Sequence, residues 1–184
     1  PVDISKAQLM DFADRTAERF SRLRIQPICA DYNRPFEPHG LLREASRRIV
    51  YFPGSTIGNF DPACAVEMLS RMKDLVGPHG GILLGLDLAK SPKIIEPAYN
   101  DSQGVTAAFN LNALTHLNRV TGSNFEVSQF RHNAVYRPEH HRVEMHLVSS
   151  TVQEVTIGGQ TILLDRGEAI VTEHSHKYPL EVFD

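Results

Sequence analysis

The chain has 184 residues, of which 41% are hydrophobic, 22% charged and 8% aromatic, and its formal net charge is −3. This is the composition of an ordinary globular protein, long enough to bury a core without disulfides or structural metals. Because the charge balance is slightly acidic, the chain is a poor candidate for a general polyanion binder, and we expect no nucleic-acid partner.

Cysteine spacing and hydropathy indicate the compartment. Cys29 and Cys64 show no CxxC or CxxH spacing, so we expect neither a disulfide framework nor a structural zinc site. No apolar run approaches the ~18 residues that a membrane span needs, and no export signal is visible at the first residues. These features predict a cytoplasmic protein without a membrane partner. We interpret the chain, which opens on Pro1, as a segment of a longer protein.

The first half of the chain alternates predicted strands and helices. The expected elements are a helix from Lys6 to about Phe20 with Ser5 as N-cap, a strand over 24–29, a loop over 31–40, a strand over 48–52, a helix over 62–76 capped by Asp61, and a strand over 81–87 buried on both faces. This alternation is typical of a parallel sheet with helical crossovers. Residues 1–90 are therefore expected to form part of a doubly wound, Rossmann-like α/β domain.

The second half has a different pattern. A helix is expected over 105–120, followed by strand-like segments over 125–136, 141–153, 155–157, 161–164 and 168–174, with a hairpin turn at Gly158, Gly159 and Gln160. We predict a smaller α+β domain over 91–174 and a return segment over 175–184.

Polar residues follow the predicted strands of the first domain. They are Asp3, Asp31, Asn59 and Asp87. Ligands of open parallel sheets collect beyond the carboxyl ends of the strands, and a carboxylate there can accept hydrogen bonds from ribose hydroxyls or an adenine amino group. The pattern favours an adenosyl-bearing cofactor, although aspartates after strands also serve as ordinary turn and cap residues.

The loop after the 48–52 strand has the composition of a binding loop. It contains Gly54, two hydroxyl residues, a second glycine and Asn59 before the next helix begins. An amide can donate to a carboxylate and accept from an amine at the same time. The alternative is a generic turn between a strand and a helix.

The last predicted strand places four polar residues on two faces. Side chains of a strand alternate, so Glu173 and Ser175 share one face while His174 and His176 share the other. The carboxylate and hydroxyl could grip a small heterocycle that has one ring N–H and one ring acceptor. The histidine pair raises a metal site as a rival, but zinc sites need three or four ligands and the spacing supplies two, so we expect no metal.

Three motifs in order resemble one known family. They are Phe52-Pro-Gly-Ser-Thr-Ile-Gly-Asn-Phe60, then Ala98-Tyr-Asn-Asp101 with Gly104-Val-Thr-Ala-Ala-Phe-Asn110, and Thr172-Glu-His-Ser175. Together they resemble the histidine-specific N-α-methyltransferases of ergothioneine biosynthesis, over nearly the whole chain. The resemblance implies a class I methyltransferase domain, with S-adenosylmethionine as methyl donor, joined to a substrate-binding domain, and conversion of L-histidine to its trimethyl betaine, hercynine.

The resemblance also implies roles for individual residues. On the cofactor side, Asp3 would hold the ribose, and Asp31 and Tyr32 the adenine. The backbone end of histidine would be held by Asn59 and Tyr99, close to Gly54. The imidazole would be held by Glu173 and Ser175 and packed by Phe109 and Met145, with Thr106 nearby.

Some questions stay open at this point. The glycine-rich cofactor loop of the family would lie before Pro1, so we expect this segment to bind the cofactor poorly and to be inactive alone. Methylation of another amino acid is one alternative, and a non-catalytic ligand-binding or metal-binding module is another. The sequence does not define an oligomeric state.

Overall fold

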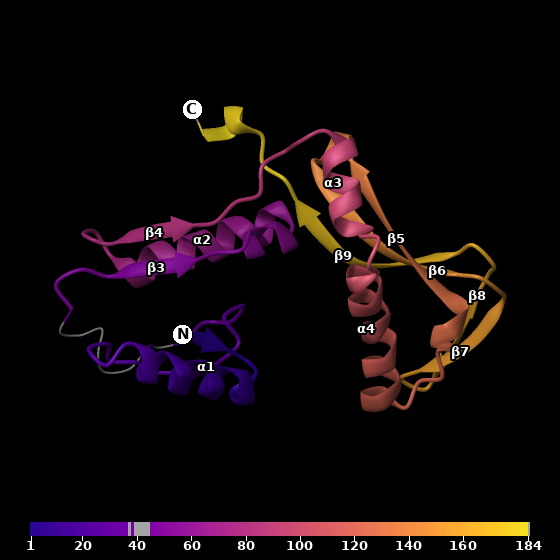
Figure 1. Cartoon of the computed structure of the whole chain (residues 1–184), viewed down its shortest axis with the longest axis horizontal. Coiled ribbons are helices and arrows are strands. Elements are labelled where there is room, and N and C mark those ends of the chain that lie inside the picture. The colour runs from indigo at the N-terminus through magenta and orange to yellow at the C-terminus, as the bar shows by residue number, and fades with distance from the viewer. Residues whose placement is uncertain (37, 39–44, 184) are drawn as a thin grey trace. The chain divides into compact units, whose positions relative to one another are not determined.

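The computed structural model describes residues 1–36, 38 and 45–183, and it divides into two compact units. Unit 1 comprises Pro1–Tyr51 and Val66–Leu83, and unit 2 comprises Phe52–Ala65 and Leu84–Asp184. Figure 1 follows the order of the elements along the chain. The predicted division near residue 90 stays a prediction. The predicted loop over 31–40 lies partly outside the described residues, since 37, 39 and 40 are not among them.

The first part of the chain forms short strands and two helices. They are β1 (Val2–Asp3), α1 (Lys6–Arg19), β2 (Ile28–Cys29), β3 (Ile49–Phe52), α2 (Pro62–Val76) and β4 (Gly81–Leu84). β1 pairs in parallel with β2, and β3 pairs with β4. Both helices were predicted within one residue, and Asp61 caps α2 by accepting a hydrogen bond from the Cys64 N–H at 3.0 Å. Cys29 and Cys64 are both exposed, and neither forms a disulfide within the described residues.

Three local expectations are corrected. The predicted strand over 24–29 is reduced to Ile28–Cys29. Ser5 makes no side-chain cap, and its N–H instead donates to Asp3 Oδ1 at 2.7 Å. The strand predicted over 81–87 ends at Leu84 and is not buried on both faces, because Leu83 is 61% exposed. Within the described residues β4 belongs to a sheet of two strands, which cannot enclose it as a wide sheet would.

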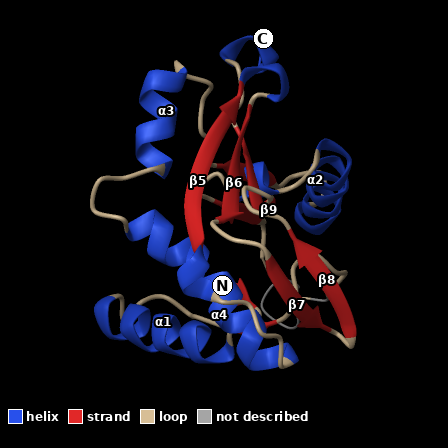
Figure 2. Ribbon diagram, turned by 90° about the vertical axis from the view of Figure 1, so that its right-hand side faces the viewer, coloured by secondary structure: helices blue, strands red, loops and turns tan. Residues whose placement is uncertain are grey.

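Unit 2 combines helices with antiparallel strands. Its main elements are α3 (Pro92–Tyr99), α4 (Val105–Thr121), β5 (Phe130–Arg137), β6 (Arg142–Ser149), β7 (Gln153–Ile157), β8 (Gln160–Leu164) and β9 (Ala169–His176), with the short 3-10 turn η1 (Thr56–Asn59) before them. β6 lies between β5 and β9 in a three-stranded antiparallel sheet (Figure 2). The predicted hairpin turn joins β7 to β8, and Gly158 and Gly159 both take positive φ there.

Two hydrophobic clusters hold the helices of unit 2 against its strands. Leu114 of α4 is buried with Phe130 of β5 and Leu147 of β6. Ile95 of α3 is buried with Tyr136 of β5. The eight-residue helix α3, which contains an internal proline, was not predicted. The fold is therefore a mixed α/β arrangement, as expected, with small sheets.

The N-terminus of α4 has a strong cap. Asp101 accepts hydrogen bonds from the backbone N–H groups of Val105 at 2.9 Å and Thr106 at 2.8 Å. The bonds to Thr106, and then that to Val105, lower the pKa of Asp101 to about 2. The carboxylate thus fixes where α4 begins and how α3 turns into it.

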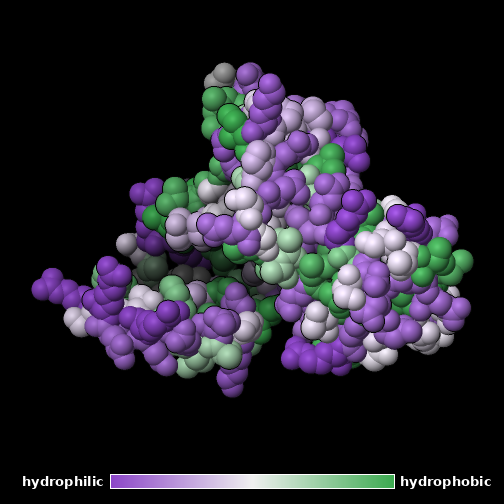
Figure 3. Space-filling model, turned by 45° about the vertical axis from the view of Figure 1, so that its right-hand side comes forward, coloured by the Kyte–Doolittle hydropathy of each residue, from purple (hydrophilic) through white to green (hydrophobic). Residues whose placement is uncertain are grey.

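Surface polarity is mixed on the face of the molecule drawn in Figure 3. Hydrophobic side chains are interspersed there with hydrophilic ones, which is typical of ordinary solvent-exposed surface. Across the described ranges, no helix is both long and apolar enough to cross a bilayer.

Candidate functional site

Unit 2 contains a pocket of about 470 Å³ to which four of its segments contribute. They are the loop that leads into η1, the segment that follows β4, the last turn of α3, and the end of β9. The residues that line the pocket are Gly54, Ser55, Thr56, Asn59, Gly85, Leu86, Asp87, Tyr99, Glu173, Ser175 and Lys177. Five of the eight predicted substrate-binding residues are among them: Gly54, Asn59, Tyr99, Glu173 and Ser175.

The loop that carries Asn59 is fixed to β9 by a close backbone approach. His176 Nδ1 lies 2.8 Å from the Gly58 carbonyl oxygen, and a Cβ atom on Gly58 would lie 2.8 Å from the His176 carbonyl oxygen. Only glycine allows this spacing. The same loop contacts the segment after β4, because the Asp87 N–H donates to Ser55 Oγ at 2.9 Å. Asn59 is thereby held against the strand that carries Glu173.

Tyr99 is positioned by polar contacts at the end of α3. The side chain of the next residue, Asn100, donates to the Ala134 carbonyl and accepts from the Ala134 N–H, both at 2.8 Å. His132 Nε2 lies 2.8 Å from the Tyr99 carbonyl oxygen. These bonds tie the last turn of α3 to β5 and aim the phenol at the pocket.

Glu173 and Ser175 share one face of β9, as alternation predicts, and both line the pocket. Glu173 lies opposite Met145, and Ser175 lies opposite Val143 of β6, in the ladder of β6 and β9. His174 and His176 belong to the other face, where they pair in register with Glu144 and Arg142. The two-residue period continues past the strand, so Lys177 joins Glu173 and Ser175 in the pocket.

Lys177 was missed by the sequence analysis, although the alternation Glu-x-Ser-x-Lys could have indicated it. Its side chain is only 1% exposed. Nζ donates to Tyr99 Oη at 2.6 Å and to Ser175 Oγ at 2.8 Å, and it lies 3.1 Å from Asp87 Oδ2. The ammonium also lies 4.8 Å from the centre of the Tyr99 ring. A buried ammonium is compatible with this site because its donors are all used.

The carboxylates of the pocket respond differently to their surroundings. Burial raises the pKa of Glu173, while the charge of Lys177 acts against that rise. Burial also acts to raise the pKa of Asp87, but the hydrogen bonds from Lys90 and Lys177 outweigh it, and that pKa is lowered. Asp87 therefore serves as the fixed counter-charge of Lys177, whereas Glu173 is available to a ligand.

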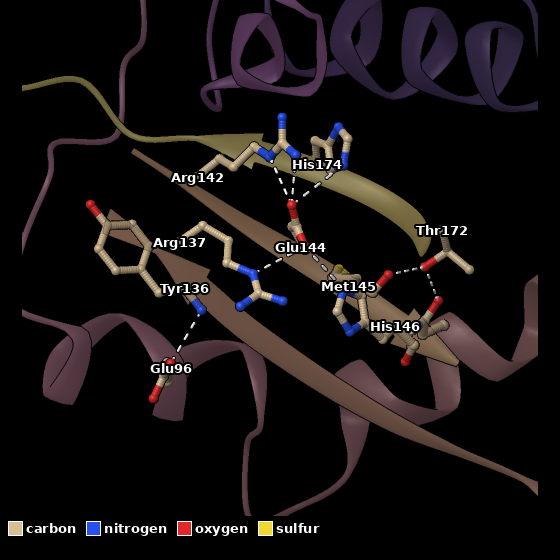
Figure 4. A network of polar contacts seen from close by, with 10 residues as sticks. Glu96, Tyr136, Arg137, Arg142, Glu144, Met145, His146, Thr172 and His174 are labelled. Carbon is tan, nitrogen blue, oxygen red and sulfur yellow. Dashed lines mark hydrogen bonds and ion pairs between the residues drawn. The ribbon is translucent and has the colours of Figure 1, made fainter. Parts of the chain in front are cut away.

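The opposite face of the sheet holds a separate polar network (Figure 4). Glu144 accepts hydrogen bonds from Arg142 at 2.6 Å and Arg137 at 3.3 Å, and His146 Nε2 lies 3.2 Å away. The bond from Arg142 is the main reason that the pKa of Glu144 falls to about 2. This network stabilises β5 and β6 but does not contribute to the pocket.

The rival metal site gains no support from the arrangement of the histidines. The rings of His174 and His176 have centroids 6.4 Å apart, and His176 Nδ1 is engaged with the Gly58 carbonyl. Within 1–36, 38 and 45–183, no group of three or more histidine, cysteine or acidic side chains is arranged to hold a metal ion.

Three predicted substrate residues do not line the pocket. Phe109 of α4 is 68% exposed, and Met145 is buried in the cluster that Tyr99 covers. The backbone of Thr106 is used in the cap by Asp101. The roles expected for these residues stay predictions.

The three predicted cofactor residues come together in unit 1. Asp3 ends β1, which pairs in parallel with β2, and the Ala30 N–H donates to the Asp3 carbonyl at 3.1 Å. Burial, and then the negative charges of Asp3 and Asp31, raise the pKa of Tyr32. Both carboxylates thus lie near one phenol at the carboxyl end of a parallel strand pair, where a ligand of an α/β sheet is expected.

Comparison with known proteins identifies the family. The family model described as "Histidine-specific methyltransferase, SAM-dependent" matches residues 1–184. The chain therefore belongs to the histidine-specific, S-adenosylmethionine-dependent methyltransferase family.

Individual relatives agree with this assignment. The histidine N-alpha-methyltransferase of Mycolicibacterium smegmatis is 36% identical over 181 residues, covering 97% of this chain and 55% of that protein. The protein of the same name from Mycobacterium tuberculosis is 34% identical over 181 residues, with the same coverage. Ergothioneine biosynthesis protein 1 of Neurospora crassa is 39% identical over 69 residues, 38% of this chain and 8% of that protein. The chain thus spans about half the length of the two mycobacterial relatives.

Proposed function

We propose that the chain is part of a longer enzyme that methylates the α-amino group of L-histidine, and that it contains the substrate pocket of that enzyme. The observation that carries the proposal is that Asn59, Glu173 and Ser175 line one pocket, although they come from segments far apart in the sequence. An amide suits the zwitterionic head of an amino acid, and a carboxylate with a neighbouring hydroxyl suits the two nitrogens of an imidazole.

The proposal extends to the cofactor and the product. S-adenosylmethionine would supply the methyl group from its sulfonium, and Asp3, Asp31 and Tyr32 would bind its adenosyl part within a Rossmann-like domain. These residues offer the acceptors that ribose hydroxyls and an adenine amino group require. The product would be the trimethyl betaine hercynine, formed by successive transfers to the same nitrogen.

The pocket would act by positioning its substrate. A neutral amine needs little acid–base help to attack a methyl sulfonium, so the gain comes from holding the reacting atoms in line, which can supply up to about 7–11 kcal/mol. Anchoring histidine at both ends fixes the direction of its amine. We propose that Glu173 and Ser175 anchor the ring and that Asn59 and Tyr99 anchor the backbone end.

Calorimetric titration of L-histidine tests the proposal. Glu173→Ala should weaken histidine binding by about 10- to 100-fold, because a hydrogen bond to a charged group contributes about 1.5–3 kcal/mol. Glu154→Ala, which removes an exposed strand glutamate of the same unit, is the matched control. Affinity for S-adenosylhomocysteine, which this segment is expected to bind poorly, should be equally low in the wild type and in both variants. Equal histidine affinity of the wild type and Glu173→Ala would refute the proposal.

A further inference from the structure

Lys177 occupies the pocket in a way that the proposed anchoring of histidine does not require. It is buried, and a lysine is almost never fully buried unless it is paired, as Lys177 is with Asp87. Its main chain is fixed as well, because the Lys177 N–H donates to the His141 carbonyl at 2.6 Å. The next residue pairs with the segment after β4, since the Tyr178 N–H donates to the Asp87 carbonyl at 2.9 Å. Lys177 and Asp87 are thus held together by backbone and side chain.

Counting donors and acceptors fixes the direction of the hydrogen bonds in this part of the pocket. A lysine ammonium has three donors and no acceptor. Those of Lys177 are directed at Tyr99 Oη, Ser175 Oγ and Asp87 Oδ2. Each of the two hydroxyl oxygens therefore accepts one bond from the ammonium.

The two hydroxyls also share a bond with each other. Tyr99 Oη and Ser175 Oγ lie 3.0 Å apart, so one of them donates to the other. Both oxygens accept from the same ammonium, so that bond does not distinguish the two hydroxyls. A phenol is the stronger acid of the two and hence the better donor, which assigns the donor role to Tyr99. The oxygen of Ser175 then accepts two bonds and has only its own proton to offer a ligand.

We propose that Lys177 is a positioning residue that turns Ser175 into an obligatory donor and so selects the neutral imidazole of histidine. The inference rests on the proposed function. A neutral imidazole has one N–H, which Glu173 can accept, and one bare nitrogen, which can accept from Ser175. An imidazolium has two N–H groups, and one of them would face the Ser175 proton. An indole has no ring acceptor and would leave that proton unpaired.

The charged and titratable groups around Lys177 come from three elements. They are Asp87 and Lys90 after β4, Tyr99 of α3, and Glu173 and Tyr178 on or after β9. Glu173 itself loses charge as the pH falls, which would weaken any ligand that donates to it. The test therefore compares L-histidine with 1,2,4-triazolyl-3-alanine, whose ring keeps an N–H and an acceptor but stays neutral in mild acid.

The measurement is the calorimetric affinity of the protein for each of the two ligands at about pH 7.5 and about pH 5.5. When the pH falls from about 7.5 to about 5.5, the wild type should lose about tenfold more affinity for histidine than for the triazole analogue. The reason is that the neutral fraction of an imidazole with a pKa near 6.5 falls about tenfold over this range. In Lys177→Met the oxygen of Ser175 regains a free lone pair and can accept from an imidazolium. The extra loss should then shrink to less than about threefold, while affinity at the higher pH falls by about tenfold or more.

Two further variants separate this role from a merely structural one. Tyr99→Phe also frees a lone pair on Ser175, and it does so without a change of charge. It should therefore abolish the extra loss of histidine affinity, and it supplies the test if Lys177→Met does not fold. Lys90→Met removes the exposed partner of Asp87 and should keep the wild-type extra loss. The inference is overturned if folded Lys177→Met, or Tyr99→Phe, loses as much histidine affinity relative to the triazole analogue on acidification as the wild type does. Absence of histidine binding by the wild type would instead overturn the proposed function, and the inference with it.

Discussion

The phenol oxygen of Tyr99 lies 3.0 Å from the hydroxyl oxygen of Ser175, although 76 residues separate them in the chain. The first residue is proposed to hold the backbone end of the substrate and the second its ring. A direct bond between them means that the two ends of the pocket are not independent. Changes at one end should therefore alter binding at the other.

A double-mutant cycle measures this coupling. Tyr99→Phe and Ser175→Ala should each weaken histidine binding, and the double variant should lose less than the sum of the two single losses. We expect a coupling free energy of about 1 kcal/mol, within the range found for residues in one network. The four dissociation constants come from calorimetry. If the losses of binding free energy in the two single variants added up to the loss in the double variant, the two hydroxyls would act independently.

Gly58 should be intolerant of even the smallest side chain. In Gly58→Ala the new Cβ would meet the His176 carbonyl oxygen at 2.8 Å and the His176 nitrogen at 3.2 Å, and both are backbone atoms. The loop carrying Asn59 would have to move away from β9. We expect a cost of about 1–3 kcal/mol in the free energy of unfolding and weaker histidine binding.

Gly81→Ala provides the matched control for this experiment. The atom nearest to a Cβ there is the end of the Arg47 side chain at 4.0 Å, so the substitution is tolerated sterically. Urea unfolding and histidine titration of both variants give the comparison. Similar stability and affinity for the two variants would contradict the close approach of Gly58 to β9.

Asn110 should be a stability residue of unit 2. Its side chain is 2% exposed, and its Nδ2 lies 2.9 Å from His132 Nδ1 and 3.2 Å from the His146 carbonyl. Thr172 Oγ1 lies 2.6 Å from Asn110 Oδ1. Asn110→Ala removes these bonds at a buried position, although Thr172 Oγ1 keeps the Met145 carbonyl, 3.0 Å away, as an acceptor. We expect a loss of about 2–4 kcal/mol in urea unfolding.

Asn112→Ala, on the exposed side of the same helix, is the control for Asn110→Ala. It should be nearly neutral, because alanine is the better helix former. Because the amide of Asn110 donates to His132 Nδ1, the other ring nitrogen carries the proton that is donated to the Tyr99 carbonyl. Asn110→Ala should therefore weaken histidine binding even where the protein stays folded.

Glu144 should make the chain less stable at low pH. Its folded pKa of about 2 lies below the ordinary value of 4.5, so the carboxylate stabilises the fold fully above about pH 4.5. That contribution, up to about 3 kcal/mol, is lost as the pH falls through about 2. Glu144→Gln should be less stable at neutral pH and should lose less stability on acidification than the wild type.

Thermal unfolding at a series of pH values checks the role of Glu144. Glu139→Gln, which removes an exposed carboxylate in the turn between β5 and β6, is the control. It should reproduce the acid sensitivity of the wild type. If the stability of Glu144→Gln and of the wild type depended on pH in the same way, the ion network around Glu144 would not be the source of the acid sensitivity.

Local patterns account for the parts of the site that could be predicted. Alternation along a strand is a property of neighbouring residues, so the common face of Glu173 and Ser175 follows from the sequence. The cap by Asp61 and the turn at Gly158 and Gly159 are equally local. The motifs that place Asn59 in a binding loop depend on residue types at short spacing, and the pocket contains that loop.

Features that depend on distant segments were missed. Burial of Lys177 requires Tyr99, 78 residues away, and the carboxylate of Asp87, and no local pattern encodes that meeting. The break in pairing register at Met145 and His146 depends on how β6 and β9 fit together. The expectation that 81–87 is buried on both faces failed because an apolar run does not reveal how many strands surround it.

A crystal structure of the chain with L-histidine tests the central claim most directly. We predict one ring nitrogen within about 3 Å of the Glu173 carboxylate and the other at the same distance from Ser175 Oγ, with the amino-acid head beside Asn59. A histidine whose ring points away from Glu173, or which binds outside this pocket, would contradict the account.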